Sequence, residues 1–356
     1  MKRVFILVVL LSLGADLQSF TWIGGADGEH QRATSKGAKT KMELHVVDDE
    51  GVPVSDVNVE TVFAMGADFQ SGVFKTDAAG LVVVEGVTTG NTVELFLKKE
   101  SYYSSHLKFC YLKFGENRKV KDGKWQPWRE SRNVVLRKIV NPKPIQRHCG
   151  FVDVPQTNEW IGLDMACGDW VRPYGKGVVA DLDLMVQWDG MQKPLSRNCF
   201  MQVRMNGVGC GGTFTNRVLE SEFPYPHEAE TNDMYEVRSF FWKERENGIR
   251  MKEQSFWNQL NFVTRSRCVV DESGRVKEAN YGCIRELEVG PGDEGRPVLG
   301  LHCVFNPTPN DTNLEDMDIA QRTYKQIELE KRFERERREK EKKTVWGGVK
   351  KMFGAP

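Results

Sequence analysis

Six aromatic residues stand in polar or glycine- and proline-containing stretches, where a side chain can face solvent. They are Tyr102, Tyr103, Trp125, Trp128, Trp170 and Tyr174. A flat ring on a rigid scaffold can stack on a sugar ring while nearby polar groups fix its orientation. Large rings also bury well, so the competing interpretation is packing in a core or between domains. The sequence nominates these six residues as ligand-binding candidates, with carbohydrate as the ligand class.

A second group of residues has the chemistry of a metal or proton-transfer site. It comprises Glu220, Glu222, His227, Glu228, Glu230 and Asp233. Carboxylates with one imidazole suit a hard or borderline cation. Two prolines in the same segment favour a solvated acidic loop instead, so we expect no metal and no cofactor. Residues 311–315 alternate like a calcium loop but lack its glycine, so Asp311 or Thr312 is predicted to cap a helix.

Nucleophilic catalysis has little support in the sequence. His148-Cys149 and His302-Cys303 are adjacent pairs, and neighbouring residues of a strand point to opposite faces. No G-x-S-x-G, H-E-x-x-H or phosphate-binding-loop motif occurs. A site assembled in space leaves no such motif. The sequence therefore favours a protein without enzymatic activity and nominates no catalytic residue.

The N-terminus has the pattern of an export signal. Lys2 and Arg3 precede an apolar run from Val4 to Leu13 that is too short to span a bilayer. Residues 1–25 are predicted to be a signal peptide and residues 26–40 a flexible lead-in. The protein is then periplasmic, on the cell surface or secreted, and its eight cysteines could form up to four disulfides there. An Asn206-Gly207 hairpin turn would place Cys210 opposite Val203.

Short alternating or β-branched runs, separated by turn residues, predict the elements that carry these side chains. The first such runs are Met42–Val47, Val57–Phe63 and Gly72–Lys75. They predict a β-sandwich over residues 41–140, ended by two prolines, and a second β-rich domain over residues 145–310. The expected fold class is mainly β, with two antiparallel sandwich-like domains and a charged C-terminal helix.

Residues 314–343 contain neither glycine nor proline, and opposite charges recur four residues apart. This pattern predicts a solvent-exposed helix whose thin apolar stripe is insufficient for a coiled coil. Residues 344–356 form a basic, aromatic tail. Residues 321–356 hold 12 Lys/Arg against 6 Asp/Glu, so the tail could contact an anionic surface. The formal net charge is zero, which argues against nucleic acid as a partner.

The stretch from Gly51 to Tyr103 carries recurring strand-and-turn motifs. They are Gly51-Val52-Pro53-Val54 with Val57 and Val59, then Thr76-Asp77-Ala78-Ala79-Gly80, then Gly86 and Gly90. This third of the chain resembles the carboxypeptidase regulatory-like, transthyretin-like sandwich family. Ser101 stands where that family often has glycine before its tyrosine, and residues 108–128 form an insertion. The resemblance implies a non-catalytic accessory domain in an exported bacterial protein.

The predicted function is that of a non-enzymatic exported binding or cell-envelope interaction protein. Its partner would be a glycan or an envelope protein. Two alternatives remain open. One is a structural or assembly protein tethered through its tail, and the other is a polysaccharide or peptide hydrolase with its site in the second domain.

Overall fold

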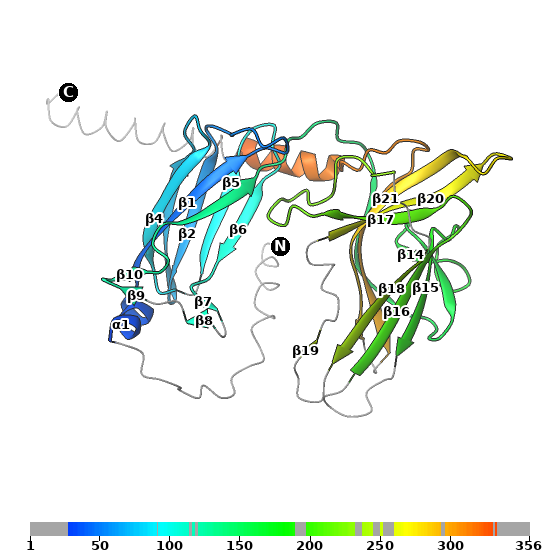
Figure 1. Cartoon of the computed structure of the whole chain (residues 1–356), viewed down its shortest axis with the longest axis horizontal. Helices are drawn as coiled ribbons and strands as arrows, with labels where there is room; N and C mark the ends of the chain where they lie inside the picture. Colours follow the sequence, from blue (N-terminus) through cyan, green and yellow to red (C-terminus); the bar gives the residue numbers. More distant parts are fainter. Residues whose placement is uncertain are drawn as a thin grey trace, which may run out of the picture.

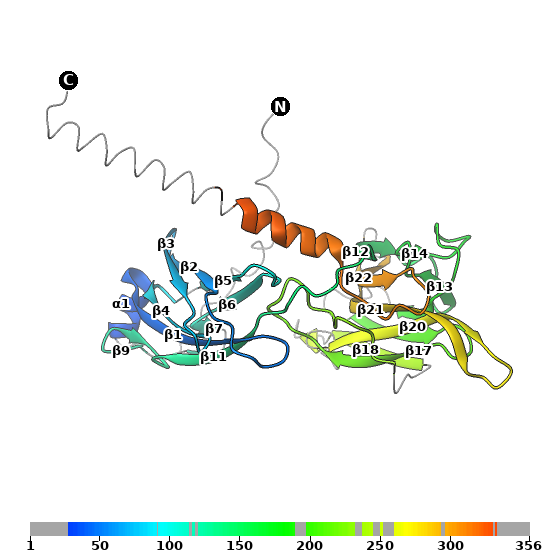
Figure 2. The ribbon, with the colours of Figure 1, turned by 90° about the horizontal axis from the view of Figure 1, so that it is seen from above.

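The computed structural model describes residues 28–90, 92–113, 116–117, 120–188, 197–231, 237–244, 250–251, 260–292, 296–329 and 332. The predicted signal peptide and basic tail lie outside these residues. Two β-rich halves lie side by side, and a helix runs between them along one side (Figures 1 and 2). No helix within the described residues is long and apolar enough to cross a membrane. The predicted mainly β fold class is confirmed.

The first half is built from two facing sheets (Figure 2). Sheet I contains β1 (Ala38–Val47), β4 (Leu81–Thr88), β9 (Val120–Lys121), β10 (Lys124–Trp125) and β11 (Glu130–Val135). Sheet II has the order β3 (Asp68–Lys75), β2 (Asn58–Met65), β5 (Val93–Lys98) and β6 (Ser105–Phe109). A short hairpin of β7 (Leu112–Lys113) and β8 (Glu116–Asn117) follows. Most pairs are antiparallel, but β10 and β11 run parallel to β1.

Alternating side chains build the core of the first half. Val59 and Phe63 of β2 and Leu95 of β5 face inward and are buried. They pack against sheet I because period-two alternation places every second side chain on one face. Gly86 of β4 is required here, since a Cβ atom would come within 2.5 Å of the Phe63 ring.

The predicted flexible lead-in is wrong for the part that the structure describes. Residues Gly28–Lys36 form helix α1, and β1 begins at Ala38. Ala33 is buried, and the Glu29 carboxylate accepts a hydrogen bond from the Asp122 backbone N–H (3.1 Å). Tertiary contacts therefore order a segment whose polar composition resembles a linker.

The second half also has two sheets. Sheet III has the order β12 (Gln146–Asp153), β22 (Pro297–Asn306), β21 (Val276–Pro291), β20 (Leu260–Val270) and β17 (Gly211–Asn216). Sheet IV has the order β14 (Asp169–Trp170), β13 (Trp160–Asp164), β15 (Leu182–Trp188), β16 (Arg197–Met205), β18 (Val237–Glu244) and β19 (Arg250–Met251). Their inner faces share one apolar core. The sequence predicts a hairpin of Phe262–Val270 and Arg275–Ala279 around the turn at residues 271–274. The structure confirms it as β20–β21.

The Asn206-Gly207 hairpin is wrong. Strand β16 belongs to sheet IV and β17 to sheet III, so the chain crosses between sheets at this turn. Val203 pairs with Leu184 and Arg238, and Cys210 lies in the core instead of opposite Val203. A local turn signal does not reveal which sheet receives the next strand.

The C-terminal helix covers residues 317–329, and Arg332 is also helical. It begins later than predicted because Asp316, not Asp311 or Thr312, is its N-cap: the Asp316 carboxylate accepts the Asp318 N–H (2.8 Å). Ile319, Ala320 and Thr323 are buried, so this part of the helix is not solvated all round. The remaining part of the predicted segment lies outside the described residues.

Candidate functional site

Three of the six predicted aromatic residues are buried. Tyr103 and Trp125 have no exposed surface, and Trp170 is 2% exposed. The indole N–H of Trp125 donates to the Thr88 carbonyl (2.9 Å), and that of Trp170 donates to the Asp153 carbonyl (2.7 Å). These rings fill cores with their polar atoms satisfied, so they cannot stack on a ligand in this structure.

The other three aromatic residues are partly or largely exposed but lie apart. Trp128 precedes β11, whereas Tyr102 forms a bridge with Lys138, beyond the other end of β11. Tyr174 is 43% exposed and belongs to the second half of the chain. The structure therefore does not gather the six nominated rings into one carbohydrate platform.

The predicted acidic group is also dispersed. Glu220, Glu222, Glu228 and Glu230 are exposed, and Asp233 lies outside the described residues. Among the residues that the structure describes, no group of three or more His, Cys, Asp or Glu side chains has an arrangement that could hold a metal ion. The backbone of this segment is not a free loop, however, because Ser221, Phe223 and Tyr225 are buried between the two halves.

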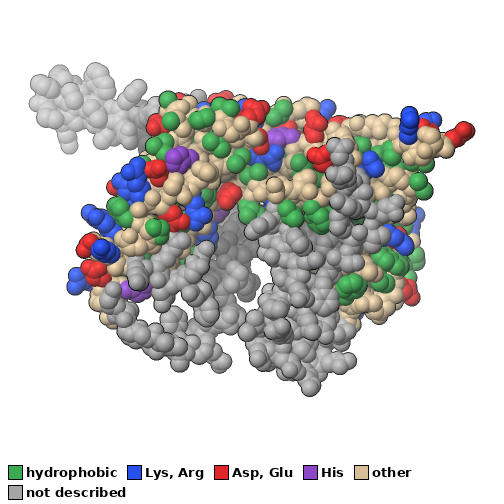
Figure 3. Space-filling view, viewed as in Figure 1, with side chains coloured by type: hydrophobic (Ala, Val, Ile, Leu, Met, Phe, Trp, Pro, Cys, Tyr) green, Lys and Arg blue, Asp and Glu red, His purple; other side chains and the backbone are tan. Residues whose placement is uncertain are grey.

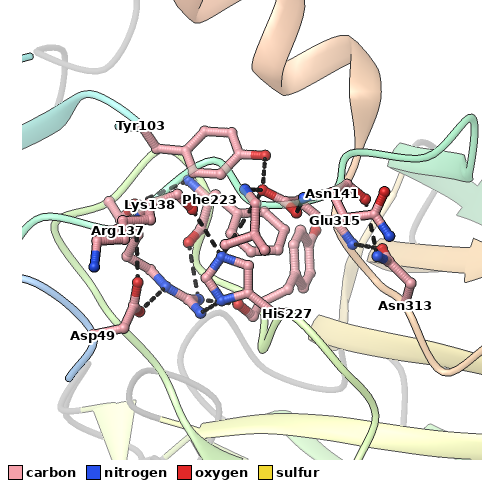
Figure 4. A network of polar contacts seen from close by, with 12 residues as sticks. Asp49, Tyr103, Arg137, Lys138, Asn141, Phe223, His227, Asn313 and Glu315 are labelled. Carbon is pink, nitrogen blue, oxygen red and sulfur yellow. Dashed lines mark hydrogen bonds and ion pairs between the residues drawn. The ribbon is translucent and has the colours of Figure 1, made fainter. Parts of the chain in front are cut away.

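The two halves meet at a buried polar network (Figure 4). The Glu315 carboxylate accepts hydrogen bonds from the Tyr103 hydroxyl (2.9 Å) and from the backbone N–H groups of Val140 (2.8 Å) and Asn141 (2.5 Å). The Asn313 side chain donates to the Asn141 carbonyl (2.9 Å) and accepts the Glu315 N–H (2.8 Å). One carboxylate thus holds the interdomain segment against the helix. Burial and then Glu315 raise the pKa of Tyr103 well above its usual range, so its hydroxyl remains a donor.

Arg137 forms the other half of this network. Its guanidinium donates to Asp49 (2.7 Å), to the Tyr225 carbonyl and to His227 Nδ1 (2.7 Å). A guanidinium only donates, so Nδ1 carries no proton and Nε2–H donates to the Lys138 carbonyl (2.8 Å). His227 is therefore an interdomain contact and not a metal ligand. The buried network has a structural role.

The second half also completes one edge of sheet II. The backbone N–H of His106 donates to the Glu220 carbonyl (2.8 Å), and Glu222 N–H donates to the Ser104 carbonyl (3.0 Å). Ser105 and Ser221 form an antiparallel bridge. Residues 220–222 therefore lie along the outer edge of β6.

The opposite edge of sheet II is different. Strand β3 is the last strand of the sheet and pairs only with β2 among the described strands. Phe69 and Val73 project from it and are 72% and 73% exposed. An exposed outer strand presents backbone N–H and C=O groups that another chain can pair with, and proteins commonly block such edges with charge, proline or a cover. Residues 69–74 of β3 contain no charged residue and no proline, and no second strand among the described residues pairs with its outer edge.

The outer face of sheet II carries an aromatic stack on β5 and β6, which are separated from this edge by β2. Register aligns Val73, Glu60, Phe96 and His106 in one row across the four strands. The Phe96 and His106 rings are parallel, with centroids 4.5 Å apart. Lys98 pairs with Glu60 (3.1 Å) and His106 with Glu94 (3.3 Å), so the charges of this face have partners within it. The β3 edge and this face together form the candidate binding surface.

Charge does not mark one preferred surface on the side of the molecule seen in Figure 3. Acidic and basic side chains are interspersed there without a broad patch of one sign. Electrostatic steering therefore gives no guide to a partner on this side. The sequence signal for the candidate surface was the alternation of Phe69, Ser71 and Val73, but alternation cannot reveal whether a strand is central or at an edge.

Comparisons with known proteins show only weak likeness. No family model and no curated protein matches the sequence. Solved structures with some similarity include 3-chlorocatechol 1,2-dioxygenase from Rhodococcus opacus 1CP, at 16% identity and a TM-score of 0.24, over 30% of this chain and 62% of that chain. Chlorocatechol 1,2-dioxygenase from Pseudomonas putida has 10% identity and a TM-score of 0.23, over 34% of this chain and 70% of that chain.

The matched part thus spans less than two thirds of the first of these enzymes. Such low TM-scores carry no argument about this chain. The matches also do not bear on the resemblance to carboxypeptidase regulatory-like domains, which stays a prediction.

Proposed function

We propose that the protein is a non-enzymatic exported binding protein whose first domain captures an extended polypeptide segment of a cell-envelope protein along β3. One observation carries the proposal. Strand β3 is an open edge with two exposed apolar side chains, whereas the opposite edge of the same sheet is covered by residues 220–222. Addition of a strand to an exposed edge is a common mode of peptide recognition.

The β2–β3 turn determines which backbone groups would be used. Gly66 has φ +73°, and Met65 faces Asp68 across a two-residue turn. In such a hairpin the two residues that flank the turn are hydrogen-bonded to each other, and the pattern alternates along the strand. Asp68, Gln70 and Gly72 then bond to β2. The N–H groups of Phe69, Ser71 and Val73 point away from β2, toward the position of an added strand.

The side chains on the outer face of sheet II suggest which residues the bound partner segment would contain. Phe69 and Val73 offer apolar contact, while the charges at Glu60 and Glu94 are already paired with basic side chains. An added strand would place every second residue next to Phe69, Ser71 and Val73. We therefore expect a partner segment with apolar residues at alternate positions and little charge.

A proline at Ser71 tests the proposal directly. Proline removes the outward N–H and is tolerated on edge strands, so Ser71→Pro should keep the fold and block strand addition. The probe is a random-peptide display library selected on the full-length secreted protein. We expect the selected peptides to be alternating and apolar and to lose about tenfold or more in affinity for Ser71→Pro. Ser71→Thr, which keeps the N–H, is the matched control.

Hydrogen exchange locates the bound peptide. Binding should slow amide exchange at Phe69, Ser71 and Val73 and leave β12 unaffected. Peptides that bind Ser71→Pro as tightly as wild type would disprove the β3 site. Self-association that Ser71→Pro abolishes would instead show that the occupant is a second copy of the chain, as in the assembly alternative.

Export is the other part of the proposal. It is supported by the basic and apolar pattern of residues 2–13. Expression of the full-length chain in a bacterium, followed by fractionation and intact-mass measurement, should give a processed protein outside the cytoplasm. An unprocessed cytoplasmic protein with every cysteine reduced would exclude export.

A further inference from the structure

The two His-Cys pairs of the sequence lie opposite one another in the sheet. Strands β12 and β22 are antiparallel neighbours, and their register aligns His148 with Cys303 and Cys149 with His302. Each cysteine therefore has a histidine across the ladder, with one such pair on each face of sheet III. The inner pair contains the fully buried Cys303. The outer pair contains Cys149, which is exposed.

The outer pair is in contact. Cys149 Sγ lies 3.1 Å from His302 Nε2. On the other side of the imidazole, Nδ1 lies 3.1 Å from an Arg285 guanidinium nitrogen and 3.3 Å from a Glu286 carboxylate oxygen. Both residues come from β21, where a bulge between Ile284 and Glu286 lets them meet the same ring. Three strands thus supply a thiol, an imidazole and two groups that orient it.

The groups around His302 determine which of its ring nitrogens carries the proton. Burial lowers the pKa of His302; Glu286 and Glu288 oppose this shift, and Arg285 and Arg147 add to it. The imidazole is therefore neutral at neutral pH. Since the guanidinium can only donate, Nδ1 is the acceptor and the single proton sits on Nε2, directed at Sγ. The His302 N–H group is thus aimed at the sulfur of Cys149, and the thiolate is the nucleophilic form of cysteine.

An apolar surface adjoins the thiol. Phe151, two residues along β12 on the same face, is 73% exposed. It lies opposite Gly300, where an added Cβ would approach the Phe151 ring to 3.1 Å. The exposed ring provides a contact for the organic part of a small molecule that reacts at Cys149.

We propose that Cys149 is a nucleophilic thiol for exchange with organic disulfides, positioned and activated by His302. The Cys149 thiolate, whose proton has gone to solvent, attacks one sulfur of the disulfide. A new S–S bond forms, the original S–S bond breaks, and the second sulfur leaves as a thiolate that takes a proton from water. The product is a mixed disulfide on Cys149. This inference does not rest on the proposed binding at β3, which lies in the other half of the molecule.

The chain contains an internal control. Cys167 also has an exposed side chain, but partial desolvation and the Asp164 carboxylate raise its pKa, and its thiol donates to the Asp164 backbone carbonyl (3.8 Å). The two exposed thiols therefore have opposite surroundings, one facing a histidine N–H and the other facing acidic groups. Their relative reactivity reports the effect of the His302 contact within one molecule.

The experiment reacts the reduced full-length protein with limiting dithiodipyridine, a neutral disulfide, and follows each cysteine by peptide mass spectrometry. Cys149 should react about tenfold faster than Cys167. The Cys167 rate should also begin to fall at a higher pH than the Cys149 rate, because the pKa of Cys167 is raised. His302→Gln should reduce the Cys149 rate about fivefold or more and leave the Cys167 rate unchanged, which also shows that the variant is folded.

Equal rates for Cys149 and Cys167 in the wild-type protein would overturn the proposal without any variant. An unchanged Cys149 rate in His302→Gln would overturn the role of His302. If His302→Gln unfolds, the buried Cys303 will react as well. The proposal is then tested by the wild-type protein alone, from the ratio of the Cys149 and Cys167 rates and the pH dependence of that ratio. None of these rates depends on a peptide at β3, so failure of one proposal is distinguishable from failure of the other.

Discussion

At the scale of single residues, neutral donors satisfy the Glu315 carboxylate in the buried network between the two halves. Glu315 is 1% exposed, and two backbone N–H groups and one hydroxyl donate to its carboxylate. His227 Nε2 lies 3.9 Å from this carboxylate, and the hydrogen bonds of the imidazole indicate its neutral tautomer. A buried charge is tolerated only if its hydrogen bonds are made, so this site depends on all three donors.

The first prediction concerns Glu315→Gln. An amide has one acceptor oxygen, and its NH2 group would face donors from the interdomain segment. We expect a loss of about 1–3 kcal/mol in the free energy of unfolding, measured by urea denaturation. Glu220→Gln, at an exposed side chain, should change it by less than about 0.5 kcal/mol. Equal effects of the two substitutions would contradict the assigned role of Glu315.

The second prediction concerns acid stability. A hydrogen bond from Lys138 lowers the pKa of Asp48 from 3.8, and the Val52 and Glu50 N–H groups add to this effect. A carboxylate with a lowered folded-state pKa contributes stability above its unfolded pKa, and this contribution is lost as pH falls through the folded value. Wild type should therefore lose stability below about pH 4 more steeply than Asp48→Asn. Parallel melting-temperature curves against pH would refute this.

At the scale of elements, the side chains that a helix or strand buries depend on which other elements pack against it. The charged segment after residue 314 predicts a solvated helix, yet Ile319, Thr323 and Ile327 form a buried stripe. Their spacing of four residues places them on one side of the helix. This four-residue spacing is present in the sequence, but the stripe is short and lies among many charged residues, so it does not by itself predict burial.

The third prediction compares two apolar residues of this helix. Ile319 is buried in the core shared by the two halves, whereas Leu329 is 50% exposed. Ile319→Ala should cost about 2–4 kcal/mol in unfolding free energy, because it removes buried methyl groups and leaves a cavity. Leu329→Ala should cost less than about 1 kcal/mol. A small effect at Ile319 would show that the helix does not dock as described.

At the scale of the whole molecule, the junction makes the two halves depend on each other. One apolar cluster contains Tyr103 from the first half, Phe223 and Val263 from the second and Leu314 from the segment before the helix. The Tyr103 and Phe223 rings stack at 4.8 Å. Shared burial of this kind couples the unfolding of domains that each have their own core.

The fourth prediction follows from this coupling. Calorimetry of the full-length protein should show one unfolding transition, with equal calorimetric and van't Hoff enthalpies. Tyr103→Ala removes both the ring contact and the donor to Glu315, so it should separate the transition into two. Two transitions in the wild-type protein would show that the halves unfold independently. A single transition in the variant would show that Tyr103 does not couple them.

The sequence by itself determined the β-rich class, the β20–β21 hairpin and the change of character near residue 310, because these depend on local alternation and turn residues. It did not determine that Trp125 and Trp170 are buried, that residues 220–222 cover β6, or that no second described strand pairs with β3. Those outcomes depend on which sheets and halves face each other.

The His-Cys pairs also show that tertiary pairing, and not local sequence, decides which side chains meet. Within one strand, adjacent residues point to opposite faces, so the members of each sequence pair lie on different faces of sheet III. Only the antiparallel register of β12 with β22 placed Cys149 against His302. Register is set by pairing between strands about 150 residues apart, and no local pattern in either strand contains it.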